Sequence, residues 1–215
     1  MIEDQPGRIW SSDGGRSIVV VARHQQTKQS GFYRIDLATG QASQLFAGAV
    51  IIESTCVAAN QQLLYLAQSA HQSPDVWLAS GDGQTVKRVS QINPQLDQYE
   101  MGAARVIEWQ TAEGQTLRGA LMLPADYRSG KRYPLIVRLY AGRLISDDLN
   151  RFGMSRVFYE NAQLLATRGY AVLLPDVPQK PGSPMADIPK AVLDYLNRWL
   201  AWFDEHLKPQ EAGMK

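Results

Sequence analysis

The sequence contains a single cysteine, Cys56, among its 215 residues. This excludes an internal disulfide, and it also excludes a structural zinc site built from several thiolates. One cysteine fits a reducing compartment. The neighbours in Ser54-Thr55-Cys56-Val57 offer no basic group that would favour a thiolate, so we predict that Cys56 is a small buried side chain.

Long hydrophobic runs are also absent, because no stretch approaches the roughly 20 apolar residues that span a bilayer. The first residues, Met1 to Pro6, are acidic and lack the basic start and apolar core of a signal peptide. Provided that Met1 is the natural start, we therefore expect neither a transmembrane segment nor export, and the cytoplasm is the favoured location.

Neither sign of charge dominates the chain. Lys and Arg number 22 and Asp and Glu number 21, which leaves a net charge of +1. This balance gives no electrostatic reason to expect nucleic acid or an anionic membrane as a partner. Hydrophobic residues make up 45% of the chain, which is ordinary for a globular protein and enough for a buried core.

Short β-branched and aromatic runs separated by turn residues fill roughly the first hundred positions. Two of the turns, Gly40-Gln41 and Gly83-Gln84, lie 43 residues apart, and each separates two predicted strands. A repeat of this length built from short strands is typical of a four-stranded propeller blade. Two unrelated hairpins that share a Gly-Gln turn are the alternative. The predicted strands are 17–22, 31–36, 43–46, 63–67, 75–78 and 86–90.

The pattern changes after Asn93-Pro94, where a hairpin is followed by alternating strands and helices. The strands after the hairpin are nearly continuous apolar runs, as expected for strands buried on both faces of a mostly parallel sheet. This alternation indicates an α/β sheet with right-handed crossovers. The predicted elements are a hairpin at 106–123, strands at 135–140 and 170–174, a helix at 150–168 ended by Gly169, and a helix that begins at Asp187 and is limited by Pro209.

Five short motifs follow one another in this second part of the chain. They are Asn93-Pro94, Trp109 to Gly114, Leu121 to Pro124, Tyr133 to Val137 and Leu164 to Val172. Their order and spacing resemble the junction between the propeller and the hydrolase domain in the prolyl oligopeptidase family, which includes dipeptidyl and acylaminoacyl peptidases. The resemblance covers roughly half of the chain.

The resemblance implies an α/β fold with an all-β N-terminal part. Residues 1–100 would be the C-terminal blades of a β-propeller, and residues 101–215 would be the N-terminal half of an α/β-hydrolase domain. It also implies a serine peptidase that hydrolyses short peptides through an acyl-enzyme, without a cofactor or a metal ion.

Tyr140 is the one residue that the resemblance links to catalysis. In dipeptidyl peptidase-like members, a tyrosine at the end of this strand donates its hydroxyl to the oxyanion, and Tyr140-Ala141-Gly142 is similar to that site. The alternative is an aromatic side chain that caps the strand and packs on the next loop. The sequence departs from the family twice: Arg143 stands where many relatives have proline, and the loop Asp176–Ser183 lacks their arginine.

The sequence contains no Gly-x-Ser-x-Gly nucleophile elbow. Gly153–Val157 comes nearest but fails at its last position, and Ser155 follows a polar segment instead of a strand. Ser183 lies in a Pro/Gly loop and is no better candidate. We therefore expect that the chain stops before the catalytic Ser, Asp and His and is inactive alone. The three histidines are expected at the surface: His24, His71 and His206.

Two other groups of residues were considered as sites. Asp147-Asp148 could form a metal or acid pair, but adjacent carboxylates in a loop are usually solvated. Trp199 and Trp202 could bind a ligand, yet their helical spacing favours packing.

Two other functions are compatible with the sequence. A non-catalytic propeller/sheet module would act as a partner or scaffold, and an unpaired edge strand would then favour self-association. An esterase-type α/β-hydrolase is the other possibility, since a fold does not fix a substrate.

Overall fold

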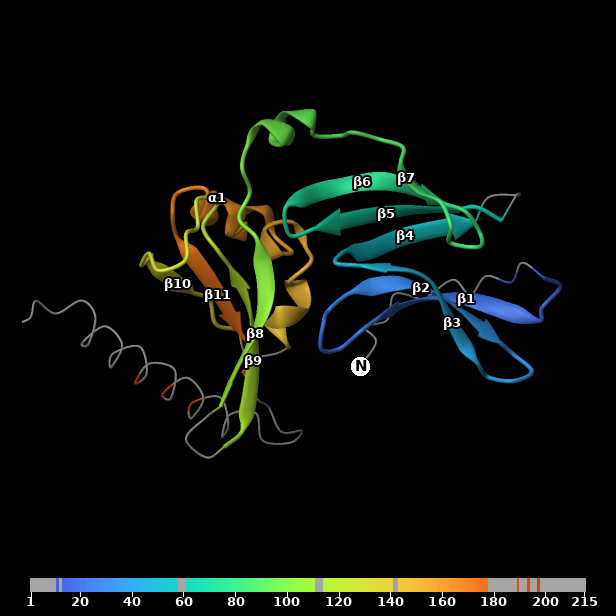
Figure 1. Cartoon of the computed structure of the whole chain (residues 1–215), viewed down its shortest axis with the longest axis horizontal. Helices are drawn as coiled ribbons and strands as arrows, with labels where there is room; N and C mark the ends of the chain where they lie inside the picture. Colours follow the sequence, from blue (N-terminus) through green and yellow to red (C-terminus); the bar gives the residue numbers. More distant parts are fainter. Residues whose placement is uncertain are drawn as a thin grey trace, which may run out of the picture.

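Three β-sheets make up most of the described structure (Figure 1). Two antiparallel sheets come first in the chain, and a mixed sheet follows them. Helix is scarce between residues 13 and 177 and occurs in short segments. The computed structural model describes residues 11, 13–57, 61–110, 114–140 and 143–177, and the single positions 189, 193 and 197.

The first two sheets are meanders in which each strand pairs with the next. Their order is β1-β2-β3 and β4-β5-β6-β7. Most of their strands coincide with the short β-branched and aromatic runs of the sequence. The strands are β1 (Ser17–Arg23), β2 (Ser30–Asp36), β3 (Ala42–Gly48), β4 (Ile51–Val57), β5 (Leu63–Ser69), β6 (Gln72–Ala79) and β7 (Val86–Arg88).

The two Gly-Gln turns occupy equivalent places in these sheets. Gly40 connects β2 to β3 with φ of 72°, and Gly83 connects β6 to β7 with φ of 75°. Each glycine N–H donates to a carbonyl at the end of the preceding strand, Asp36 O at 2.8 Å and Ser80 O at 2.9 Å. The left-handed conformation favours glycine at both positions. The 43-residue spacing is therefore present as two hairpins with equivalent turns, which is consistent with a propeller-like part.

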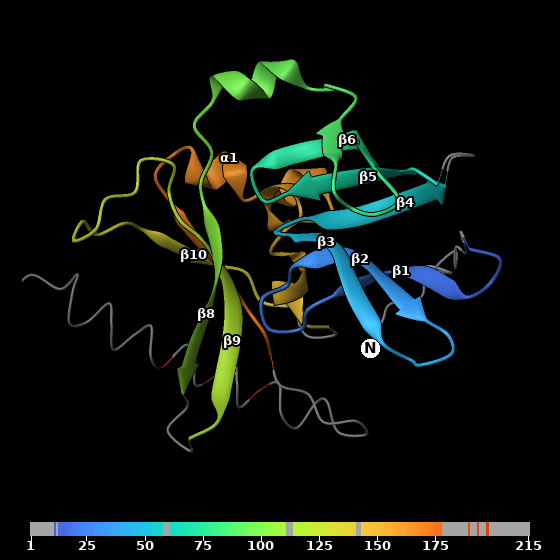
Figure 2. The ribbon, with the colours of Figure 1, turned by 45° about the vertical axis from the view of Figure 1, so that its right-hand side comes forward.

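The first two sheets pack against each other through one hydrophobic core (Figures 1 and 2). Phe32 on β2 is fully buried and meets the ring of Tyr65 on β5 edge to face, with centroids 5.0 Å apart. Burial raises the pKa of Tyr65 to about 12. The other buried members are Val19, Leu63, Ala67 and Ala79.

The third sheet has the order β10-β11-β9-β8. Its first two strands in the chain form the predicted hairpin, and β11 pairs antiparallel with β9. Only β10 and β11 pair in parallel among the described strands, so the expectation of a mostly parallel sheet is not met there. The strands are β8 (Ala104–Gln110), β9 (Thr116–Met122), β10 (Leu135–Val137) and β11 (Ala171–Pro175).

Strand β10 is shorter and more exposed than the sequence predicts. It ends at Val137 instead of residue 140, although the Arg138 N–H still donates to Leu173 O at 2.9 Å. Leu135 is 38% exposed. Among the described strands, β10 pairs only with β11, so its second edge has no described partner. An apolar strand buried on both faces was the expectation, and it is wrong for this part of the chain.

The helix predicted at 150–168 is also wrong, because the segment breaks into short pieces. Gly153 has φ of 65° and Met154 has φ of 50°, and two consecutive left-handed residues cannot continue a right-handed helix. Ser155 is then extended. Gly169 ends the last piece as predicted, with φ of 84°. The pieces are η3 (Phe152–Met154), η4 (Phe158–Glu160) and α1 (Gln163–Ala166), preceded by η2 (Ile145–Asp148).

Gln163, at the start of α1, connects the second sheet to the third. Its side chain is only 3% exposed. The amide nitrogen donates to Ala70 O and Gly102 O, both at 2.9 Å, and the amide oxygen accepts from Gly102 N at 2.7 Å. Ala70 is at the β5–β6 tip and also belongs to the core of the third sheet. One buried amide therefore holds three segments together.

Cys56 is exposed, which corrects the expectation of a buried side chain. The register between β4 and β5 shifts between Glu53 and Cys56, and Ser54 in this irregular stretch has φ of 45°. A bulge of this kind re-aims the side chains that follow it. The sequence around Cys56 gave no sign of the bulge.

The predicted C-terminal helix is described at three positions only. Residues 189, 193 and 197 are helical, and their spacing of four puts them on one exposed face. The apolar residues predicted for this helix lie outside the described residues. So do Ser183, Trp199, Trp202 and His206.

Substituting Gly153 tests the break in the predicted helix. We expect Gly153→Ala to destabilise the fold by about 1–3 kcal/mol through overpacking, beyond the cost of its positive φ. A Cβ there would lie 1.8 Å from Asn161 Oδ1, which already accepts from the Gln163 N–H. Urea unfolding measures the loss. Gly130→Ala is the control, since Gly130 has φ of 83° but open space around it. Equal losses for the two variants would contradict the clash.

Candidate functional site

Tyr140 lies three residues beyond the end of β10, at the C-terminal end of the parallel strand pair. Its side chain is 56% exposed. An exposed hydroxyl on a short connection to a sheet strand is free to meet a molecule from outside, and the strand limits its movement. Ala141 and Gly142, which follow it in the family-like motif, lie outside the described residues.

Arg143 packs its guanidinium over the Tyr140 ring, 5.8 Å from the centroid. The same guanidinium forms an ion pair and hydrogen bond with Asp148 Oδ2. Arg143 therefore connects the exposed tyrosine to a buried carboxylate. A cation over an aromatic face is an attractive arrangement, and it also restricts the ring.

Asp148 is fully buried and is surrounded by arginines. Besides Arg143, its Oδ1 lies 3.1 Å from Arg156 Nε and 3.3 Å from Arg151 Nε. A buried carboxylate without such partners would be strongly unfavourable. The expectation that the Asp147-Asp148 pair is solvated is therefore wrong for Asp148. The local sequence gave one unused signal: three arginines lie within eight residues of this aspartate.

Asp147 faces the first sheet instead. Its carboxylate meets Lys28 Nζ at 2.7 Å and Arg23 Nη2 at 2.9 Å. Lys28 is only 4% exposed, so this pair is largely removed from water. The Asn150 amide adds a hydrogen bond to Lys28 O at 2.7 Å. The β1–β2 loop is thereby fixed to η2 across more than a hundred residues of sequence.

The second sheet is also joined to this part of the chain by an ion pair and hydrogen bonds. Arg151 Nη1 lies 2.7 Å from Glu53 Oε1 on β4. The Phe152 N–H donates to Gln68 Oε1 on β5 at 2.9 Å, and Gln68 in turn donates to Glu53. The segment from Arg143 to Phe152 therefore contacts both propeller-like sheets, while it also follows directly from Tyr140.

Asp176 anchors this segment to the third sheet. Its carboxylate accepts from the Ser146 N–H at 2.8 Å and from the Ser146 hydroxyl at 2.5 Å. Burial raises the pKa of Asp176, and the two bonds from Ser146 oppose that rise. Because this pKa is raised in the folded state, stability from this group is lost as pH rises from the unfolded pKa through the folded one. From Pro178 onward, the loop that was noted for its missing arginine lies outside the described residues.

The remaining candidates give no nucleophile or base in the described part of the chain. Ser155 directs its hydroxyl to Val157 O at 2.9 Å and caps η3. His24 is exposed and accepts two backbone N–H bonds through Nδ1, and His71 is also exposed. Within the described residues, no three His, Cys, Asp or Glu side chains are grouped to hold a metal ion.

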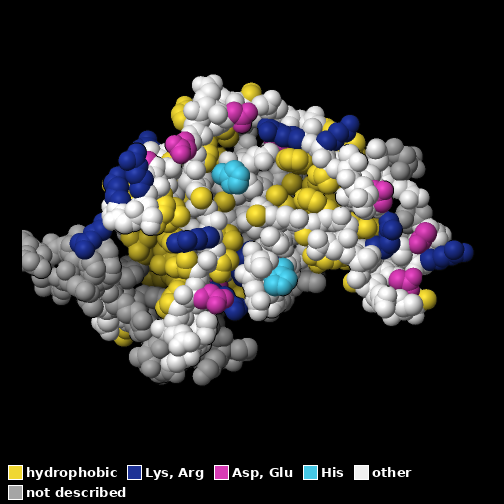
Figure 3. All heavy atoms as spheres, in the orientation of Figure 1, with side chains coloured by type: hydrophobic (Ala, Val, Ile, Leu, Met, Phe, Trp, Pro, Cys, Tyr) yellow, Lys and Arg dark blue, Asp and Glu magenta, His cyan; other side chains and the backbone are white. Residues whose placement is uncertain are grey.

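No helix among the described residues has the length and hydrophobicity needed to cross a bilayer. On the face shown in Figure 3, hydrophobic side chains gather around the third sheet, and basic and acidic side chains are interspersed elsewhere.

No protein-family model matches the sequence, and no curated protein matches it significantly. Solved structures do match. The apo isopeptidase AtxE2 superposes with a TM-score of 0.68 at 18% identity, covering 92% of this chain and 32% of that one. The acylaminoacyl peptidase of Pyrococcus horikoshii gives a TM-score of 0.59 at 14% identity, covering 94% of this chain and 32% of its own. Dipeptidyl peptidase 4 of Porphyromonas gingivalis gives a TM-score of 0.55 at 19% identity, covering 78% of this chain and 24% of that one.

These structures are peptidases of the prolyl oligopeptidase family. The chain has their fold. It spans between about a quarter and a third of the length of these three structures. That fold accounts for the order observed here, two propeller-like sheets followed by a mixed sheet, and at the level of fold it agrees with the resemblance seen in the sequence.

Substituting Asp148 tests the buried ionic cluster. We expect Asp148→Asn to destabilise the protein by about 3–5 kcal/mol, because it leaves arginines without their buried counter-charge. Asp126→Asn is the matched control. Asp126 is 58% exposed and pairs with Lys131 at 3.4 Å, so its loss should cost less than about 1 kcal/mol. Chemical unfolding of both variants measures the difference, and similar losses would show that the cluster contributes little.

Proposed function

We propose that this chain is part of a serine peptidase of the prolyl oligopeptidase type that hydrolyses short peptides through an acyl-enzyme. Residues 1–100 would supply the last propeller blades, and residues 101–215 the first half of the hydrolase domain. The observation that carries the proposal is the position of Tyr140, at the C-terminal end of a parallel strand in a sheet that follows two propeller-like sheets.

Tyr140 would act in this reaction as an oxyanion donor. A tetrahedral intermediate places negative charge on the former carbonyl oxygen, and a rigid O–H aimed at that oxygen stabilises it. The exposed hydroxyl and the guanidinium over the ring suit this role, since Arg143 adds positive charge beside the developing anion. The nucleophile, acid and histidine would have to come from a polypeptide that continues the hydrolase sheet.

The coding sequence beyond Lys215 tests the proposal directly. We expect an in-frame Gly-x-Ser-x-Gly motif within a few dozen codons, at a strand-to-helix junction. The 215-residue chain by itself should not react with a fluorophosphonate probe, because it contains no such elbow. The protein extended through the motif should be labelled at that serine. Stoichiometric labelling of the 215-residue chain would overturn this assignment.

The extended protein also tests Tyr140. Tyr140→Phe should lower kcat by about 10²–10³-fold with little change in KM, because it removes one donor from the transition state alone. Steady-state hydrolysis of a short chromogenic peptide measures both constants. Tyr99→Phe is the control, since Tyr99 is 62% exposed on the connection between the second and third sheets. An unchanged kcat for Tyr140→Phe would leave the tyrosine with a packing role only.

The open edge of β10 favours one other function, a non-catalytic module that binds a partner or a second copy through its sheet. Leu135 and Ile136 on this strand are partly exposed, and unpaired edges recruit other strands. Size-exclusion chromatography with light scattering distinguishes the two functions. A stable monomer over a wide concentration range would argue against the module.

A further inference from the structure

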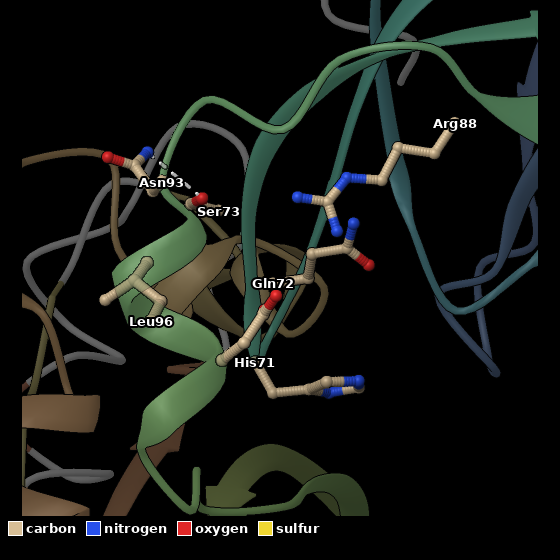
Figure 4. Close-up of a pocket in the computed structure, with 7 residues that line it drawn as sticks. His71, Gln72, Ser73, Arg88, Asn93 and Leu96 are labelled. Carbon is tan, nitrogen blue, oxygen red and sulfur yellow. Dashed lines mark hydrogen bonds between the residues drawn. The ribbon is translucent and has the colours of Figure 1, made fainter.

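A small polar pocket lies where the second sheet passes into the connection to the third. It encloses about 170 Å³. Its walls come from the β5–β6 tip at His71 to Ser73, from Arg88 on β7, and from η1 (Pro94–Gln98) with the preceding Asn93 (Figure 4). None of these residues takes part in the proposed peptidase chemistry.

One buried donor in this pocket has no hydrogen-bond partner in the described part of the chain, and a guanidinium lies beside it. The Gln72 side-chain nitrogen is buried and has no hydrogen-bond partner among the described residues. Figure 4 shows the Gln72 amide and the Arg88 guanidinium pointing toward one another, with the His71 ring projecting in the same direction. A buried donor left unpaired is costly, so native proteins normally supply an acceptor. The Gln72 amide can therefore donate to an oxygen of a bound ligand.

Arg88 is held in place before any ligand arrives. Its Nη2 lies 2.6 Å from Asp75 Oδ2, and its Nε donates to Ser90 O at 2.8 Å. Asp75 is fully buried and is fixed by the Ser90 hydroxyl at 2.6 Å and the Ile92 N–H at 3.0 Å. A donor whose orientation is already fixed binds a carboxylate at a lower entropic cost.

The pocket also has a negative side. Asp97 lines it from η1 and accepts from Gln91 at 2.7 Å through Oδ2. Since Asp75 already neutralises Arg88, a simple anion would meet unfavourable net charge from Asp97. A ligand that carries a carboxylate and an ammonium group would satisfy both sides.

We propose that this pocket binds a small α-amino acid. The carboxylate would lie between Gln72, Arg88 and His71, and the ammonium group would face Asp97. The volume suits a ligand of few heavy atoms, since pockets for drug-sized molecules are about 300–1,000 Å³. Binding would connect the β5–β6 tip to η1, and so would stiffen the connection between the second and third sheets. The proposal does not depend on the peptidase function.

Nuclear magnetic resonance titration of the 215-residue chain with glycine tests this site. The ring C–H signals of His71, assigned with His71→Gln, should shift in a saturable way with millimolar affinity. The signals of His24, on the β1–β2 loop, should stay unchanged. Acetate and methylammonium each carry only one of the two charged groups, so they should bind more weakly than glycine. Absence of a saturable shift would overturn the proposal, as would a shift of equal size with sodium chloride.

Two near-isosteric variants separate the two sides of the pocket. Gln72→Glu should weaken glycine binding by at least about tenfold, because it puts a carboxylate where the ligand's carboxylate belongs. Asp97→Asn should weaken glycine binding but strengthen acetate binding. Gln44→Glu on β3 is the control, and thermal melting verifies that each variant is folded. Unchanged glycine affinity in Gln72→Glu, or parallel effects on glycine and acetate in Asp97→Asn, would contradict the assignment.

Discussion

The buried carboxylate of Asp148 constrains everything around it, because an ionised group removed from water must find its counter-charges within the protein. Three arginines form ion pairs with it, and two of these arginines also contact other parts of the protein. Arg143 covers Tyr140, and Arg151 reaches Glu53 on β4. The exposed tyrosine and the propeller-like sheets are therefore connected through one negative charge. Around it, Asp147, Asn150 and Gln163 add contacts to the same interface.

Through Arg143, this interface also contacts Tyr140, the proposed oxyanion donor. The chain after Tyr140 returns to the third sheet only at β11. Between these points it has little regular structure, so ionic and hydrogen-bonded contacts take the place of a helix. Arg143 restricts this segment through its ion pair with the buried Asp148.

Local patterns predicted most strands, both Gly-Gln turns and the β8–β9 hairpin, because alternation and turn residues act over a few positions. Several expectations failed, most of them where contacts between distant residues decide the structure. The apolar spacing between 150 and 168 favoured a helix, yet Gly153 and Met154 turn the chain toward Ala70. The cations that pair with Asp147 lie 119 and 124 positions away in the sequence. Cys56 is exposed because of a bulge. Tyr140 was found only through resemblance, since no local rule distinguishes it from other tyrosines.

The contacts of Gln163 also affect how the protein folds. Its amide joins Ala70 and Gly102, which lie 93 and 61 residues earlier in the chain. Closing such long loops costs entropy before any contact repays it, and folding slows as the average separation of contacts grows. During synthesis, the β5–β6 tip therefore cannot form its hydrogen bond with Gln163 until α1 has left the ribosome. Until then, the Ala70 and Gly102 carbonyls, which will accept hydrogen bonds from the Gln163 amide, must be hydrated, and the junction forms late.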